Sequence, residues 1–109
     1  MELKYDYWTG NMKQVLESLN RSLGQYHRHY RKVKIGVTNN PERRKDEHRR
    51  SKIKWDYMDV KYKTTSVNFV TKLEIILVDR HWDYIVNEIG GGGGPTGSGA
   101  QYLYVLLKK

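Results

Sequence analysis

The sequence feature that most constrains the fold is the run from residue 33 to residue 44, where the pattern of a strand passes directly into the start of a helix. In its first half, apolar residues at every second position alternate with Lys34, Gly36 and Thr38. This period of two is typical of a strand with one buried face. Lys34 and Gly36 then share the opposite face, where a bare glycine would let a backbone or a phosphate come close.

The second half of this run predicts a basic helix. Asn40 can cap a helix, and Pro41 is favoured at the first helical position, so we expect a helix from Pro41 to about Ser51. Along this helix Arg44 and His48 are four residues apart, which places them on the same face. The strand therefore delivers the chain directly to a helix that carries two potential phosphate-binding side chains.

The other periodic segments predict a small domain of the α/β (α+β) class. Strands are expected at 3–8, 55–64 and 102–107, and helices at 12–30 and 66–81. These elements suit a small central, mostly antiparallel sheet of three or four strands flanked by helices. Because the second of these helices is apolar nearly all round, we expect it to be largely buried. The length indicates a single domain, 1–109, with a glycine-rich loop at 90–99.

Positive charge points to a polyanionic partner. The formal net charge is +8, and seven of the twelve residues from Arg43 to Lys54 are Lys or Arg. Clustered charge of this kind favours nucleic acid, because each neutralised phosphate releases counterions. We expect DNA ahead of RNA, although the sequence leaves both open.

Other function classes are disfavoured by what the chain lacks. It has no cysteine, which excludes disulfide frameworks and cysteine-based zinc sites. No apolar run approaches the roughly 18 residues of a membrane span, and the first residues lack a signal-peptide pattern. We therefore expect no membrane partner and an intracellular protein, in the cytoplasm or nucleus, that is not secreted.

The segment from Lys34 to Arg44 resembles the second half of the GIY-YIG nuclease signature, in the branch that writes KIG in place of YIG. In that family a helix-borne arginine follows about ten residues after this element, and a histidine or tyrosine often follows four residues later. Lys34, Arg44 and His48 have this spacing. Glu74 and Asn87 fall where the family has a glutamate on a later helix and an asparagine near the end of the domain.

The resemblance implies a GIY-YIG-like fold and a metal-dependent endonuclease that hydrolyses DNA phosphodiester bonds. Glu74 would hold one Mg²⁺ (or Mn²⁺), an ion that often takes a single protein carboxylate together with waters and substrate phosphates. Arg44 and His48 would hold the phosphate, since the arginine fork can brace its oxygens. Gly36, Arg43 and Asn87 would contribute to substrate binding.

The first tyrosine of the signature has no close counterpart. The family places it ten to twelve residues before YIG, across a hairpin. Tyr7 is the preferred candidate, although it precedes Lys34 by 27 residues and would need an inserted helix in place of the hairpin. Tyr5, in the same Tyr-x-Tyr group, and Tyr26, eight residues before Lys34, stay open as alternatives.

Two of the site residues also have simpler interpretations. Lys34 stands where many family members have a second tyrosine, and it could act as a base only where desolvation and neighbouring cations remove its proton. It could equally contact a phosphate as a point charge. Glu74 could be a core carboxylate paired with Arg44 or Lys34, because an unpaired buried carboxylate is costly.

Two other functions remain open at this stage. The same fold could be a nucleic-acid-binding module that has lost cleavage, or the chain could be a basic RNA-associated structural protein. No separate recognition domain is evident in the sequence. Strong sequence specificity would therefore need a homodimer, an inserted loop or a partner chain.

Overall fold

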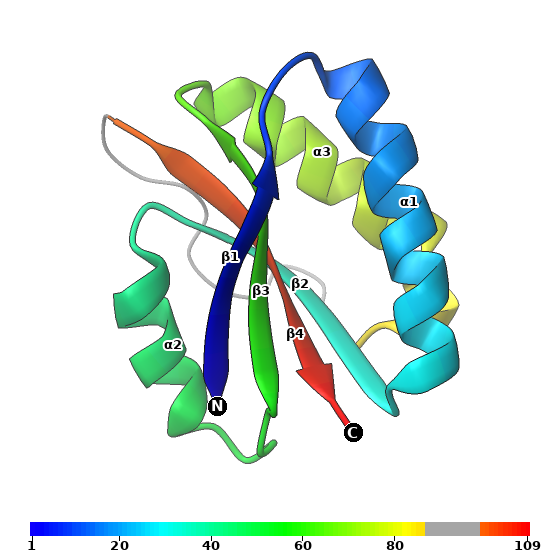
Figure 1. The fold of residues 1–109 in the computed structure, drawn as a ribbon, viewed down its shortest axis with the longest axis vertical. Helices are drawn as coiled ribbons and strands as arrows, with labels where there is room; N and C mark the ends of the chain where they lie inside the picture. The colour runs from blue at the N-terminus through cyan, green and yellow to red at the C-terminus, as the bar shows by residue number, and fades with distance from the viewer. Residues whose placement is uncertain (87–98) are drawn as a thin grey trace.

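A computed structural model describes residues 1–86 and 99–109 and consists of one sheet with helices on both of its faces (Figure 1). The strands are β1 (Glu2–Trp8), β2 (Lys32–Thr38), β3 (Tyr57–Thr64) and β4 (Gln101–Lys108). The helices are α1 (Met12–His29), α2 (Pro41–Arg49) and α3 (Val67–Arg80), followed by a short 3-10 turn, η1 (Trp82–Tyr84). Asn87 and the glycine-rich loop predicted at 90–99 lie outside the described residues, apart from Gly99.

The sheet has the strand order β1-β3-β4-β2. β1 pairs with β3 in parallel, whereas β4 is antiparallel to both of its neighbours, β3 and β2. Two of the three pairings are therefore antiparallel, and the predicted α/β (α+β) class with a mostly antiparallel, three- to four-stranded sheet is confirmed. The first three strands run in one direction, and the last strand is inserted between two of them in the other direction.

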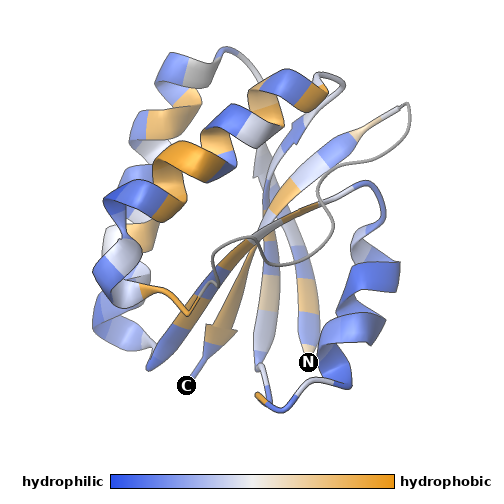
Figure 2. Ribbon diagram, turned by 180° about the vertical axis from the view of Figure 1, so that it is seen from behind, coloured by the Kyte–Doolittle hydropathy of each residue, from blue (hydrophilic) through white to orange (hydrophobic). Residues whose placement is uncertain are grey.

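The two faces of the sheet carry separate hydrophobic cores. α1 and α3 cover one face, and α2 lies on the other (Figure 1). The larger core, under α1 and α3, contains Leu19, Leu73 and Leu103, each at most 1% exposed. The smaller core, on the α2 face, contains Met58 and Leu106. Because α2 is hydrophilic along its length (Figure 2), the loop that follows it supplies apolar cover in its place, through the buried Trp55.

The alternation predicted in the second strand is confirmed. Val33, Ile35 and Val37 are buried in the larger core. Lys34 and Gly36 consequently face the opposite side of the sheet, toward α2. This alternation decides which side chains can meet the basic helix.

The helix starts also follow the sequence. The Asn40 side chain accepts a hydrogen bond from the backbone N–H of Arg43, and Pro41 occupies the first turn. Ser66 caps α3 in the same way, by accepting from the N–H of Phe69. Caps of this type satisfy N–H groups that have no partner within the helix, and this fixes where each helix begins.

The prediction that α3 is largely buried is wrong. Only Val70, Leu73 and Leu77 are fully buried, whereas Phe69 is 47% and Ile75 is 61% exposed. The helix covers one sheet face from outside, so a single stripe reaches the core and the rest meets solvent. None of the helices in the described ranges is long and apolar enough to cross a membrane.

Candidate active site

The candidate site is centred on Tyr104, a residue of β4 that is 3% exposed. Tyr104 pairs in register with Gly36 of β2. A Cβ atom added at position 36 would overlap the Tyr104 ring, so only glycine leaves room for this ring. The sequence predicted that Gly36 would admit a backbone or a phosphate. Instead, the side chain that approaches it closely is the tyrosine of the adjacent strand.

The Tyr104 hydroxyl forms a hydrogen bond with His48 Nε2 at 2.7 Å. The pKa of His48 is lowered to about 4. Burial is the largest cause of this shift, and the positive charges of Lys34 and Arg44 contribute to it. Burial also raises the pKa of Tyr104, with Arg44 opposing this effect. Both members of the pair are therefore neutral near pH 7, and the imidazole is able to accept a proton.

Arg44 brings a largely buried cation to this pair. Its side chain is 21% exposed, and Nη1 lies 3.4 Å from Oε2 of Glu47 on the same helix. Its Nε is buried and has no hydrogen-bond partner among the described residues. A buried donor without a partner is costly, and an incoming phosphate oxygen would satisfy it.

Glu74 approaches the same group from α3. Burial raises the pKa of its carboxyl, and the charge of Arg44 opposes that rise. No hydrogen bond or ion pair joins this carboxylate to another described residue, so the alternative interpretation of Glu74 as the partner of Arg44 or Lys34 in a salt bridge is not supported there. Because Arg44 acts on His48, Glu74 and Tyr104, the structure brings residues of α2, α3 and β4 to one place.

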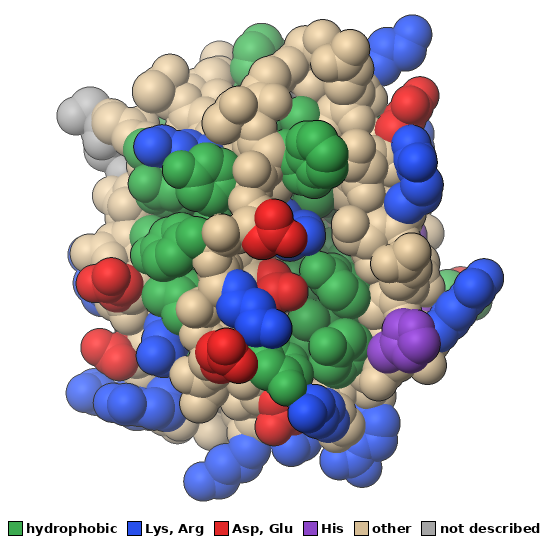
Figure 3. All heavy atoms as spheres, in the orientation of Figure 1, with side chains coloured by type: hydrophobic (Ala, Val, Ile, Leu, Met, Phe, Trp, Pro, Cys, Tyr) green, Lys and Arg blue, Asp and Glu red, His purple; other side chains and the backbone are tan. Residues whose placement is uncertain are grey.

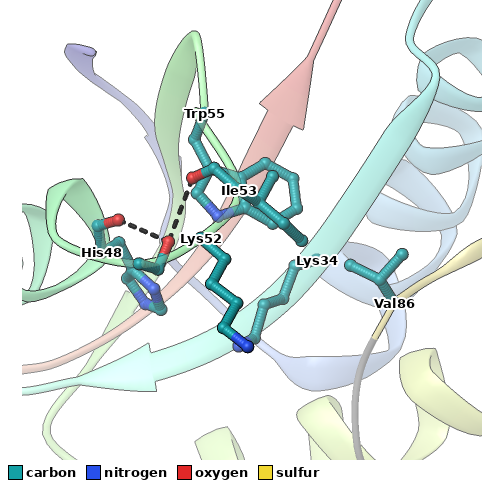
Figure 4. Close-up of a pocket in the computed structure, with 7 residues that line it drawn as sticks. Lys34, His48, Lys52, Ile53, Trp55 and Val86 are labelled. Atoms are coloured by element: carbon teal, nitrogen blue, oxygen red, sulfur yellow. Dashed lines mark hydrogen bonds between the residues drawn. The ribbon is translucent and has the colours of Figure 1, made fainter.

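A cavity of about 270 Å³ opens beside His48. Lys34 from β2 and Lys52 from the loop after α2 both line this cavity (Figure 4). Neither amine forms an ion pair with a residue of the described ranges. Two cations on one cavity repel each other, and an anion bound there would offset this repulsion. The remaining lining residues are Ser51, Ile53, Trp55 and Val86.

The other predicted site residues lie elsewhere. Tyr7 is on β1, at the opposite edge of the sheet from β2, and it does not line the cavity. Tyr26, one alternative, donates to Asp59 on the face covered by α1. Arg43 points along the surface of α2, where Nη2 donates to Asn39 at 3.2 Å. The structure thus gathers Lys34, Gly36, Arg44, His48 and Glu74 and separates Tyr7 and Arg43 from them.

Tyr104 and Lys52 are the residues that sequence reasoning missed. Tyr104 ends a Tyr-x-Tyr group, Tyr102 to Tyr104, of the same form as the group that nominated Tyr7. It lies far along the chain after the other site residues, in a segment recognised only as a strand. The Tyr-x-Tyr group of the last strand was therefore a usable signal. The resemblance places the tyrosine before the KIG element, however, and this favoured Tyr7 in the first strand.

The donor set is compatible with a divalent cation held by few protein ligands. Among residues 1–86 and 99–109, no three or more His, Cys, Asp or Glu side chains form a group that could hold a metal. Glu74 is a partly buried carboxylate without a described partner, and a cation beside it would offset its burial cost. Such a single-carboxylate site suits Mg²⁺, which keeps several waters and binds substrate phosphates.

The lowered pKa of His48 predicts that the fold is sensitive to acid. The unfolded chain takes up this proton near pH 6.5, whereas the folded chain resists it down to about pH 4. The free energy of unfolding should therefore fall as the pH drops through this window. We expect His48→Gln to remove about 1–2 kcal/mol of that fall, less than the full shift because the ring is partly exposed.

Urea denaturation at about pH 7 and about pH 4 measures this effect. His29→Gln is the matched control, since His29 is an exposed histidine near the end of α1. If both variants keep the acid sensitivity of the wild type, the His48 ring is not held neutral by the fold.

No protein-family model, curated protein or solved structure matches the chain. The likeness to GIY-YIG nucleases consequently rests on the spacing of Lys34, Arg44, His48 and Glu74 in the sequence.

Proposed function

We propose that the protein is a Mg²⁺-dependent endonuclease that hydrolyses phosphodiester bonds in DNA. The observation that carries this proposal is the neutral Tyr104–His48 pair beside the unpartnered buried Nε of Arg44. A proton acceptor next to a phosphate-binding donor is what hydrolysis of a phosphodiester requires. The resemblance to the GIY-YIG family leads to the same reaction.

In this proposal Tyr104 and His48 activate water. The water oxygen attacks phosphorus while its proton passes to the Tyr104 oxygen, and the hydroxyl proton of Tyr104 moves along the 2.7 Å hydrogen bond to His48. The leaving oxygen departs with the bonding electron pair and takes a proton from solvent. A Mg²⁺ ion held by Glu74 would stabilise the charge on that oxygen.

The cations of the site position the substrate, and they keep the pKa of His48 low until the substrate binds. Arg44 and Lys34 lower the basicity of His48 in the free protein. A bound phosphate would neutralise part of this charge, so His48 would become a better base only when the substrate is present. Lys34 acts here as a phosphate contact, with Lys52 as its partner across the cavity.

Supercoiled plasmid provides the direct test. The wild-type chain is expected to convert it to the nicked form with Mg²⁺ and to leave it intact with EDTA. Absence of cleavage, together with tight binding, would instead favour the inactive nucleic-acid-binding module. Affinity that falls with salt and favours RNA, without any response to divalent ions, would favour the RNA-associated structural protein.

Removing the two cavity lysines should lower the affinity for DNA more than the rate of cleavage of bound DNA. For the double variant Lys34→Met and Lys52→Met we expect roughly tenfold weaker DNA binding and a salt slope reduced by about 2, since each lysine contacts one phosphate. Binding isotherms in EDTA at several salt concentrations measure both. Lys13→Met with Arg21→Met, at exposed positions of α1, removes the same charge away from the site. Equal losses in the two double variants would show that only total charge matters.

A further inference from the structure

Exposed tyrosines form a second feature on the α2 face of the sheet. Tyr5 is 50% and Tyr7 is 40% exposed on β1, and Tyr102 of β4 lies beside them. With Lys63 of β3 they form a group that we name the tyrosine platform. Figure 3 shows hydrophobic side chains gathered at the surface between β1 and α2, with a cationic side chain among them.

The platform is built from three strands. The rings of Tyr7 and Tyr102 are 6.3 Å apart at 71°. The Lys63 amine lies 5.7 Å from the Tyr7 ring centre and 5.9 Å from that of Tyr102. An ammonium group held over ring faces leaves a surface that combines aromatic planes with positive charge.

The platform is on the same face of the sheet as the candidate active site. Tyr102 and Tyr104 are two residues apart on β4, so their side chains leave the same face of the sheet. Tyr5 lies near both Tyr102 and Glu42 of α2, whose charges contribute to a raised pKa of Tyr5 after burial. The platform therefore lies on the face of the sheet that carries Tyr104, between β1 and the first turn of α2.

We propose that the tyrosine platform binds unpaired bases of a single-stranded nucleic-acid segment next to the phosphate in the active site. Bases stack on tyrosine rings largely without regard to sequence, and Lys63 can contact the backbone between them. Bases in a duplex already stack on each other, so only unpaired bases present free faces. This inference rests on the proposed nuclease function and gives it a substrate class: single-stranded or frayed nucleic acid.

Core packing does not account for these rings, because much of the Tyr5 and Tyr7 side chains lies in solvent. A second copy of the chain is another potential occupant, since β1 is an edge strand. The net charge of +8 disfavours that assembly and favours a polyanion. Nucleic acid therefore fits both the rings and the charge of this face.

Fluorescence anisotropy in EDTA tests the proposal without requiring cleavage. The probes are a labelled oligothymidine of about twelve nucleotides, an abasic strand of equal length and charge, and the matching duplex. The wild-type chain is expected to bind oligothymidine roughly tenfold more tightly than the abasic strand. Equal affinity for these two probes would overturn the proposal.

Variants locate the effect on the platform. Tyr5→Ala with Tyr7→Ala should lose roughly tenfold in affinity for oligothymidine and almost nothing for the abasic strand. Tyr7→Phe keeps the ring and should bind as the wild type does. Tyr84→Ala removes a tyrosine that is 64% exposed near the end of α3, and it should have no effect. Loss of affinity in Tyr84→Ala equal to that in the double variant would overturn the assignment to this face.

Failure of this inference can be told apart from failure of the nuclease proposal. A chain that nicks plasmid but binds both strands equally would lack the platform function alone. A chain that prefers oligothymidine but never cuts would support the binding role of the tyrosine platform and contradict the nuclease proposal. If sedimentation shows that the double variant changes oligomeric state while its binding is unchanged, the face is an interface between copies.

Discussion

Glu74→Gln is expected to reduce Mg²⁺-dependent nicking by about 10²- to 10³-fold while leaving DNA binding in EDTA nearly unchanged. The amide has the shape of the carboxyl but carries no charge to hold a divalent cation. Because burial raises the pKa of Glu74, its ionised form is costly in the free protein, and removing that charge should not destabilise the fold. Plasmid cleavage over a range of Mg²⁺ concentrations, with thermal unfolding alongside, measures both quantities.

A charge control on the same helix separates the metal site from general electrostatics. Asp79→Asn removes one exposed carboxylate of α3 and should leave the rate within about twofold of wild type. High Mg²⁺ should not restore Glu74→Gln to the wild-type rate if the carboxylate is the principal ligand. A Glu74→Gln chain that cuts at the wild-type rate would remove Glu74 from the proposed chemistry.

Gly36→Ala is expected to combine a loss of stability with a loss of cleavage. The added methyl group would overlap the Tyr104 ring, which is buried between β2 and α2 and cannot move freely. Overpacking of this kind typically costs about 1–3 kcal/mol. Displacement of the ring would also break the hydrogen bond to His48, so we expect nicking to fall at least about 10²-fold.

The matched control is a glycine-to-alanine change that should increase the free energy of unfolding instead of lowering it. Gly24 lies inside α1, and a Cβ atom there would meet nothing within 4 Å. Gly24→Ala should therefore raise the free energy of unfolding by about 0.5–1 kcal/mol, as alanine does in a helix, and leave cleavage unchanged. Nicking by Gly36→Ala should be measured well below its unfolding temperature, so that loss of folded protein does not lower the rate. If that variant is as stable and active as wild type, the close packing of Tyr104 on Gly36 is not required.

The parts of the fold that the sequence predicted well are those decided locally. Asn40 and Pro41 specify a helix start within a few residues, and the alternation of β2 specifies which side chains face α2. Lys34, Arg44 and His48 meet because a strand and the helix that immediately follows it set their separation. The position of Glu74 could not be predicted from local signals alone, since it depends on how α3 packs against the same edge of the sheet.

What the sequence could not provide was the order of the strands. Pairing between distant segments depends on the whole set of faces that must be buried, so one strand contains little information about its neighbour. The resemblance made Tyr7, on the strand that precedes β2 in the sequence, the preferred first tyrosine of the signature. The structure instead places β1 at the far edge and β4 beside β2, which brings Tyr104 to the site.

The central position of β4 has a consequence for biogenesis. Among the four strands of the described ranges, β4 alone contacts both β2 and β3, so these two join no common sheet until residues 101–108 have emerged from the ribosome. During synthesis, β1 with β3 and the lone β2 would each expose an apolar edge to other nascent chains. The sheet is thus completed only when β4 pairs, and the interval before that step is when chaperones would be needed.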